Sequence, residues 1–209
     1  EICACLVGSE MCIRDSSYGR TNYEKLRRMS IIAILTAIVI ALQIICTFVK
    51  FGMFSITLAL APIIIGGALY GIGVGAFLGS VFGLVVLFTG LLGWDGGTVI
   101  YLFGQNAIAT VLLCILKGAA AGAAAALIYK LISKRSEIAA VIAAGIVCPI
   151  VNTGLFIAGM CIFFMSSLEA WATGYTMIYY LIFILAGGNF AVEFITNLLF
   201  SSAITRVIS

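Results

Sequence analysis

Lys117 and Glu193 are ionisable side chains that lie deep inside long apolar runs of this chain. A charge at the centre of a membrane helix costs roughly 2.5–3.5 kcal/mol on insertion scales, so it is retained where a partner or a ligand compensates for it. Lysine can bind a carboxylate as a point charge, and ionised glutamate accepts hydrogen bonds. We therefore expect these two residues either to bind a polar solute or to form an internal ion pair that joins two helices.

Asparagines in the same apolar runs extend this candidate binding site. Asn152 and Asn189 can each donate and accept hydrogen bonds. Asn189 precedes Glu193 by four residues, so the two side chains project from one helical face. The predicted deep site therefore consists of Lys117, Asn152, Asn189 and Glu193.

A second candidate set follows a predicted turn at Trp94-Asp95-Gly96-Gly97. Tyr101 and Gln105 come next, on the helix after the turn. Aromatic and amide groups suit a flat ring, whereas interfacial tryptophans such as Trp94 also serve as membrane anchors. Both roles are open for this set.

Several kinds of chemistry are excluded by residue types and motifs that the sequence lacks. The chain has no histidine and no G-x-x-x-x-G-K-[ST] loop, and Cys46, Cys114, Cys148 and Cys161 are scattered singly, as small hydrophobic residues are. We predict no catalytic residues, no metal site and no cofactor, so the chain is not expected to be an enzyme. Any ATP hydrolysis that drives it must take place on another chain.

The composition places the chain in a membrane. It is 64% hydrophobic and 9% charged over 209 residues, which a soluble globule of this size cannot bury. About 20 apolar residues cross a bilayer core, and six such runs are present, at 30–49, 54–70, 72–92, 99–131, 138–165 and 176–205. The predicted fold is an all-α integral membrane protein, a compact bundle of six transmembrane helices, with Pro62 and Pro149 bending the second and fifth.

Basic residues flank these spans unevenly. With six spans, one side of the membrane carries Arg20, Lys25, Arg27, Arg28, Lys130, Lys134, Arg135 and Arg206. The opposite side carries Lys50 with Asp95 and Glu169. The positive-inside rule then predicts that both termini are cytoplasmic. Aromatic side chains gather at the outer interface in this topology, namely Trp94, Trp171, Tyr175, Tyr179 and Tyr180.

The first residues differ in character from the rest. Residues 6–16 read LVGSEMCIRDS, the peptide encoded in one frame by a transposon-type sequencing adapter, and they have neither the apolar core nor the cleavage site of a secretory signal. We expect residues 1–16 to be non-native, 17–29 to be a basic cytoplasmic N-terminus and 30–209 to form the membrane domain.

Small residues recur at four-residue spacing. One predicted ladder runs through Gly67, Gly71, Gly75, Gly79 and Gly83, and shorter stripes comprise Gly118, Gly122 and Ala126, and Ala33, Ala37 and Ala41. Such faces let helix backbones approach closely in lipid. Spacing alone leaves two possibilities for each stripe, packing inside the bundle or docking of a partner protein.

The order of these motifs resembles that of a known family. The alanine stripe is followed by ITLALAPIIIGGALYGIGVGAFLGSVFGLVVL, by VNTGLFIAGM at 151–160 and by GGNFAVEFITNLLFSSAI at 187–204. Nearly everything after residue 28 is similar to the substrate-binding (S) components of energy-coupling-factor (ECF) vitamin transporters. The resemblance implies a six-helix protein that captures a vitamin or related micronutrient on the extracytoplasmic side of a prokaryotic plasma membrane and does not hydrolyse ATP.

The resemblance also implies partners. S components deliver their substrate by reorienting in the membrane against a transmembrane coupling (T) subunit, which two cytoplasmic ATPases power. The family's docking motif for the T subunit corresponds here to Ala33, Ala37 and Ala41. No nucleic acid partner is expected.

Two other function classes remain as alternatives. A stand-alone secondary transporter would usually show an inverted repeat, and none is evident between 30–92 and 99–205. An intramembrane enzyme would need a nucleophile with a base, or a metal site. The sequence does not identify the substrate, but Lys117 and the asparagines favour a ligand with a carboxylate or several hydroxyls.

Overall fold

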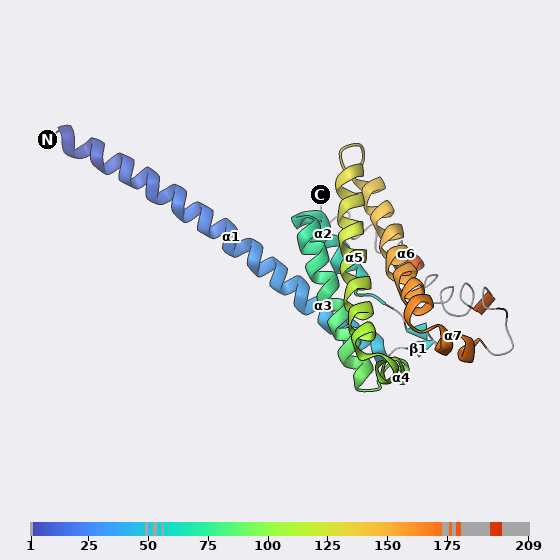
Figure 1. Cartoon of the computed structure of the whole chain (residues 1–209). Coiled ribbons are helices and arrows are strands. Elements are labelled where there is room, and N and C mark those ends of the chain that lie inside the picture. The colour runs from blue at the N-terminus through green and yellow to red at the C-terminus, as the bar shows by residue number, and fades with distance from the viewer. Residues whose placement is uncertain are drawn as a thin grey trace. The chain divides into compact units, whose positions relative to one another are not determined.

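The computed structural model describes residues 2–48, 50–51, 54–55, 57–172, 176, 179–180 and 193–197. Within them lie helices α1 (Ile2–Phe48), α2 (Leu60–Tyr70), α3 (Ile72–Leu91), α4 (Thr98–Gln105), α5 (Ala107–Ile132), α6 (Glu137–Phe163) and α7 (Met165–Trp171), and the two-stranded sheet of β1 (Lys50–Phe51) and β2 (Phe54–Ser55) (Figure 1). Residues 193–197 are also helical. The strands are antiparallel, with Lys50 opposite Ser55 and Phe51 opposite Phe54. The chain divides into two compact units, Glu1–Ile34 and Leu35–Ser209.

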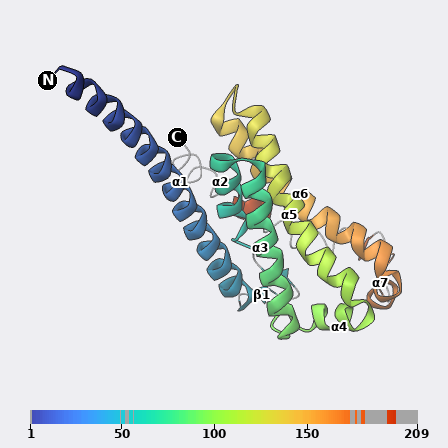
Figure 2. The same ribbon diagram turned by 60° about the vertical axis from the view of Figure 1, so that its left-hand side comes forward.

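Four helices of the larger unit pack side by side as a bundle. α3 packs along α5, α5 packs along α6, and α2 contacts all three, as Figures 1 and 2 show. The short helices α4 and α7 lie at one end of this bundle, where α3 and α6 end and α5 begins. We call this end the α4–α7 end.

Glycines form the contact between α3 and α5. A Cβ built on Gly75 would lie 2.5 Å from the carbonyl oxygen of Gly122, and one built on Gly79 would collide with the carbonyl of Gly118. Helices in lipid associate through such close packing because no hydrophobic force drives them together. This stripe of small residues is therefore internal packing, not a docking face for a partner.

The predicted ladder does not lie on one helix, however. Gly71 forms the break between α2 and α3, with a φ of +91° that a side chain would make strained. Gly67, before the break, faces Ala126 of α5. The ladder thus belongs to two helices that both pack against α5.

The second predicted span, 54–70, is only partly helical. Residues 54–55 belong to β2, and α2 has 11 residues, or about 16 Å at 1.5 Å per residue, against about 30 Å for a hydrocarbon core. Pro62 is the third residue of α2, where a missing N–H breaks no intrahelical bond. The predictions of a full-length second helix and of a bend at Pro62 were wrong, because Pro62 lies in the first turn.

The fourth predicted span, 99–131, is two helices. Asn106 separates α4 from α5 with an extended backbone, φ −151° and ψ 94°. Its Oδ1 accepts a hydrogen bond from the backbone N–H of Ala109 at 3.1 Å, which is the usual role of an N-cap asparagine. The prediction of one continuous helix was wrong here. The average hydropathy of the run indicates a single helix, but Asn106 ends α4 and caps the start of α5.

The remaining spans agree more closely with the structure. The predicted 72–92 and 138–165 correspond to α3 and α6. In the described part of the chain, four helical segments are long and apolar enough to cross a membrane: Tyr23–Phe48, Ile72–Leu91, Ala107–Ile132 and Glu137–Phe163. The protein is therefore an integral membrane protein built of helices.

Three predictions about the chain's organisation are not tested by the structure. The sixth span, 176–205, lies mostly outside the described residues, so the count of six helices is not tested. The cytoplasmic position of both termini is likewise a prediction. So is the division into 1–16, 17–29 and 30–209, although the smaller unit, Glu1–Ile34, is helical from Ile2 onward.

Candidate functional site

Glu193 is the centre of a buried polar group. Its side chain is 4% exposed, and its hydrogen-bonding neighbours Thr57 and Asn152 are 7% and 6% exposed. Lys117 acts on the same carboxyl through its charge. We name Thr57, Lys117, Asn152 and Glu193 the deep polar group. The structure thus brings together three of the four residues predicted for the deep site, and the fourth, Asn189, lies outside the described residues.

Two long helices carry Lys117 and Asn152 of this group near their midpoints. Lys117 lies ten residues after the start of α5, and Asn152 lies eleven residues before the end of α6. At 1.5 Å per residue, both are about 15 Å from the α4–α7 end, which is half of a hydrocarbon core of about 30 Å. Polar groups at this depth are costly and typically serve a function.

Thr57 reaches the group from a segment without regular structure. Residues 57 and 58 are neither helix nor strand, and Thr57 and Ala59 are buried. Irregular backbone occurs at membrane depth where protein buries it or where it lines a water-filled cavity. The short α2 therefore leaves room for a chain segment that brings a hydroxyl to Glu193.

The ammonium of Lys117 lies 4.8 Å from the centroid of the Phe156 ring. This is within the range of about 6 Å at which an aromatic face attracts a cation. Phe156 follows Asn152 by four residues on α6, so both lie on one face of that helix. Lys117 of α5 is thus oriented toward the part of α6 that carries the site.

Asn197 continues the buried face of Glu193. It lies four residues further on, is 2% exposed, and donates from Nδ2 to the carbonyl oxygen of Gly145 at 3.3 Å. That carbonyl is four residues before Pro149, which lies inside α6 and has no N–H to bond it. Asn197 therefore satisfies the acceptor that the proline leaves free.

Buried acceptor oxygens remain without partners. Among the residues that the structure describes, the buried side-chain atoms with no hydrogen-bond partner are Gln43 Oε1, Asn152 Oδ1, Glu193 Oε2 and Asn197 Oδ1. An unsatisfied buried group costs free energy comparable to a lost hydrogen bond. Two of these four atoms, Asn152 Oδ1 and Glu193 Oε2, belong to the deep polar group.

The second predicted set lies at the α4–α7 end and makes contacts there. Gln105 Oε1 accepts a hydrogen bond from Ser167 Oγ at 2.6 Å, and the rings of Tyr101 and Trp171 are 5.6 Å apart. These contacts join α4 to α7. Trp94 instead packs against Phe48 of α1, at 5.0 Å between ring centroids.

An apolar cluster lies between this second set and the deep polar group. It consists of Leu102, Ala109, Met160, Phe164 and Leu168, with Leu113, Phe156 and Trp171 packed against it. Trp171 of this cluster contacts Tyr101, and Phe156 of it contacts Lys117. In the described residues, Tyr101 and Gln105 contact Trp171 and Ser167 of α7, so the structure does not bring them together with the deep polar group.

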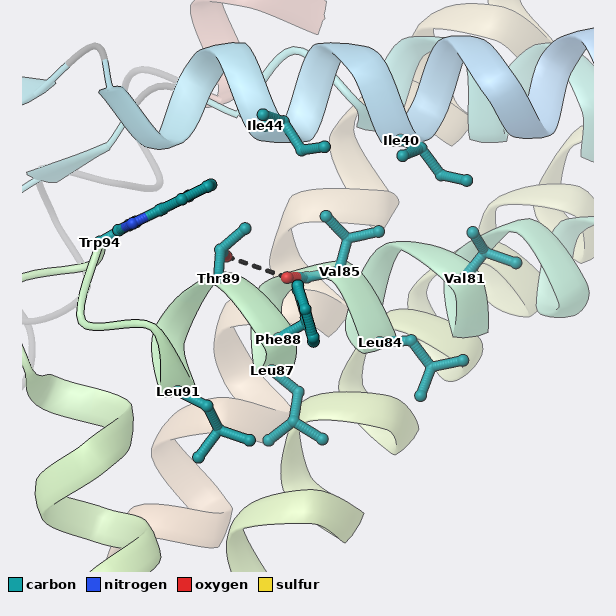
Figure 3. Close-up of a pocket in the computed structure, with 10 residues that line it drawn as sticks. All are labelled: Ile40, Ile44, Val81, Leu84, Val85, Leu87, Phe88, Thr89, Leu91 and Trp94. Atoms are coloured by element: carbon teal, nitrogen blue, oxygen red, sulfur yellow. Dashed lines mark hydrogen bonds between the residues drawn. The ribbon is translucent and has the colours of Figure 1, made fainter.

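An apolar pocket of about 640 Å³ lies between α1 and α3 (Figure 3). It is lined by Ile40, Ile44, Val81, Leu84, Val85, Leu87, Phe88, Thr89, Leu91 and Trp94. The hydroxyl of Thr89 already donates to the carbonyl of Val85 at 2.9 Å. Such a lining offers mainly hydrocarbon contact, so it suits a lipid chain better than a polar solute.

The predicted docking stripe is uncovered in the structure. Ala37 and Ala41 are exposed on the part of α1 that belongs to the larger unit, and Ala33 is exposed in the smaller unit. Val39 and Leu35, on another face of the same helix, are buried. The alanines thus leave small side chains available at the surface.

Sequence reasoning missed Thr57, Gln43 and Asn197. Asn197 could have been found by extending the four-residue spacing of Asn189 and Glu193 by one more step. Gln43 is a lone amide in an apolar run, which is the signal used for Asn152. Thr57 had no such signal, because threonine is common in membrane helices and its contact with Glu193 is distant in sequence.

Comparisons with known proteins agree with this architecture. The family model for the substrate-specific component of ECF transporters matches residues 27–209. Neither a curated protein nor a solved structure gives a significant match. The match covers most of the chain, including all of the deep polar group and the alanine stripe. The chain therefore belongs to the family of ECF transporter substrate-specific components.

Proposed function

We propose that this protein is the membrane-embedded, high-affinity binding subunit of an ATP-driven ECF importer. It captures a vitamin or related micronutrient on the extracytoplasmic side and delivers it with a separate T subunit and two ATPases. The family is one of transporter components and not of enzymes. The observation that carries the proposal is the deep polar group, whose buried residues Asn152 and Glu193 each leave an acceptor oxygen without a partner among the described residues.

The binding site in this proposal centres on Lys117, Asn152 and Glu193, with Asn189 on the same helical face as Glu193. Binding would pair groups that now lie buried about 15 Å from either membrane surface, and pairing buried polar atoms recovers the free energy of their desolvation. Trp94, Tyr101 and Gln105 stand at the α4–α7 end, which would be the extracytoplasmic entrance in this orientation. Their part in binding is secondary, because Tyr101 and Gln105 already contact Trp171 and Ser167.

The partner surface in this proposal is the alanine stripe. Ala33, Ala37 and Ala41 are exposed. The glycine stripes of α3 and α5, in contrast, pack against each other and are not available to a partner. Close approach of a partner helix needs small side chains at four-residue spacing. The stripe on α1 meets this requirement and remains free in the described structure.

Mass spectrometry of retained small molecules tests the proposal. The full chain is purified in mild detergent from cells grown in rich medium, and compounds released on denaturation are identified. A vitamin-like compound in near-stoichiometric amount is the expected result. Co-expression with a T subunit and two ATPases provides the second arm, in which a stable four-component complex is expected.

The alternative is a stand-alone secondary transporter of small solutes. It would import its solute into vesicles without ATP or partner subunits. Transport by the purified chain alone, driven by an ion gradient, together with failure to assemble with T subunit and ATPases, would replace the proposal with this alternative.

Placement in a prokaryotic plasma membrane with both termini cytoplasmic follows from the proposal. The position of the termini is checked by accessibility labelling of cysteines introduced at each terminus.

A further inference from the structure

The unpartnered atoms buried in the described part of this protein are all of one chemical kind. Gln43 Oε1, Asn152 Oδ1, Glu193 Oε2 and Asn197 Oδ1 are hydrogen-bond acceptors, and no donor nitrogen or hydroxyl stands among them in the part of the chain that the structure describes. A buried acceptor is satisfied only by an N–H or O–H group. The unmet requirement in this structure is therefore for donors.

Two of these acceptors belong to the same site. Asn152 is a hydrogen-bonding neighbour of Glu193, and their free oxygens, Oδ1 and Oε2, are both buried. Among the described residues, Thr57 and Asn152 each make a side-chain hydrogen bond to Glu193, and the ammonium of Lys117 is placed over the Phe156 ring.

We propose that the deep end of this site recognises a substrate group bearing N–H or O–H donors, which bind Glu193 Oε2 and Asn152 Oδ1, with Thr57 positioning the Glu193 carboxyl. This inference rests on the proposed function and names the chemical class of its substrate. A hydroxylated chain, a primary amide or an amino group fits it. A substrate carboxylate would be repelled by Glu193 and would lie toward Lys117 instead.

The charge of Lys117 argues for a donor-bearing substrate group at Glu193 and against a metal ion. Carboxylate and amide oxygens also bind Mg²⁺ and Ca²⁺, which take six or more oxygen ligands. Here the charge of Lys117 acts on Glu193, and a divalent cation at the same carboxyl would be repelled by that ammonium. An uncharged donor avoids this repulsion, and a singly charged donor experiences half of it at the same distance.

Thermal unfolding of the purified full chain in detergent tests the inference. Riboflavin and pantothenate serve as probes with hydroxyl and N–H donors, and nicotinate serves as a carboxylate probe without donors. We expect a donor-bearing probe to raise the unfolding temperature by several degrees at saturation. Nicotinate is expected to give a smaller shift. Stabilisation by nicotinate but by neither donor-bearing probe, or by no probe at all in protein that elutes as a single species, overturns the inference.

Substitutions then locate the donor contact. Glu193→Gln keeps the size of the side chain but removes its charge, and charge-assisted hydrogen bonds are about twice as strong as neutral ones. We expect the affinity for the stabilising probe to fall at least about tenfold. Glu169→Gln makes the same change on the exposed surface of α7 and should leave affinity unchanged. Equal affinities for the two variants overturn the inference.

Thr57 provides a variant that keeps the test valid if Glu193→Gln does not fold. Thr57→Val removes the hydroxyl at nearly constant shape, and Thr57→Ser restores it. A positioning role predicts weaker binding in the first variant and recovery in the second, at similar unfolding temperatures without probe. If both variants bind alike, Thr57 does not position Glu193 and that part of the inference fails.

The outcome is separable from that of the proposed function. A retained compound that lacks donors, found in protein that still assembles with a T subunit and ATPases, overturns the substrate class and leaves the importer proposal standing. Failure to assemble with a T subunit and ATPases, in protein whose donor-dependent binding persists, overturns the importer proposal and leaves the substrate class standing.

Discussion

Asn197 donates a hydrogen bond from Nδ2 to the carbonyl oxygen of Gly145, 3.3 Å away, at the point where Pro149 has removed the helical donor from α6. In lipid, a carbonyl freed by proline must find another donor, because no water is present to bond it. One buried side chain thus stabilises a helix to which it does not belong.

We expect Asn197→Leu to destabilise the protein by about 1–3 kcal/mol, the cost of leaving a buried acceptor without a partner. In the Pro149→Ala background, residue 149 regains an N–H that can bond Gly145, so the same change should cost less. A double-mutant cycle of thermal unfolding in detergent measures the difference. Identical costs in the two backgrounds would show that Asn197 and Pro149 are not coupled.

The contact between α3 and α5 predicts a large effect of a small substitution. A Cβ at Gly79 would collide with the carbonyl of Gly118, and overpacking of this kind typically costs about 1–3 kcal/mol. Gly73→Ala is a matched control on the same helix, because a Cβ there meets nothing within 4 Å. We expect Gly79→Ala to lower the unfolding temperature and Gly73→Ala to leave it unchanged or slightly raised. An equally stable Gly79→Ala variant would contradict the close packing.

Lys117→Met is expected to weaken substrate binding about tenfold, or roughly 1.4 kcal/mol, if the substrate carries a carboxylate in addition to its donors. Methionine keeps the apolar stem that packs near Phe156 but removes the charge. Lys130→Met makes the same change at an exposed position of α5 and serves as the control. Isothermal titration calorimetry with pantothenate, which carries a carboxylate in addition to its donors, measures both. Unchanged affinity in folded Lys117→Met protein would remove Lys117 from the binding site.

Ala37→Leu and Ala41→Leu should reduce assembly with the T subunit and leave substrate binding intact, because a partner helix can no longer approach closely. Ala139→Leu places the same extra volume at an exposed position of α6 and should assemble normally. Quantitative co-purification of the complex, at matched expression, compares the three variants. Normal assembly of both α1 variants would rule out this stripe as the docking surface.

The long helices were the most predictable part of the fold. The apolar runs at 72–92 and 138–165 correspond to Ile72–Leu91 and Glu137–Phe163, because helix length in a membrane is set by hydrocarbon thickness. Where the prediction failed, one residue mattered more than the average hydropathy of a run. Asn106 caps α5, and Pro62 lies in the first turn of α2 instead of bending it.

The charged and amide residues of the candidate site could be predicted from the sequence. Lys117, Asn152 and Glu193 stand out in apolar runs because burying them is costly, and the structure brings them together. Thr57 could not be found in the same way, since a lone hydroxyl is cheap to bury and its role depends on how far α2 extends. The contacts of Tyr101 and Gln105 with α7 were equally hidden, because they depend on the break at Asn106.

Along its glycine stripe, the α3–α5 contact contains almost no rotatable side-chain bonds, since glycines meet backbone over three successive turns. Two helices joined in this way lose little side-chain entropy on association, and neither has rotamers with which to adapt to a new arrangement. They are expected to move as one rigid body. The structural changes that accompany substrate capture should therefore fall on the irregular segment that carries Thr57, where the backbone is not tied into a helix.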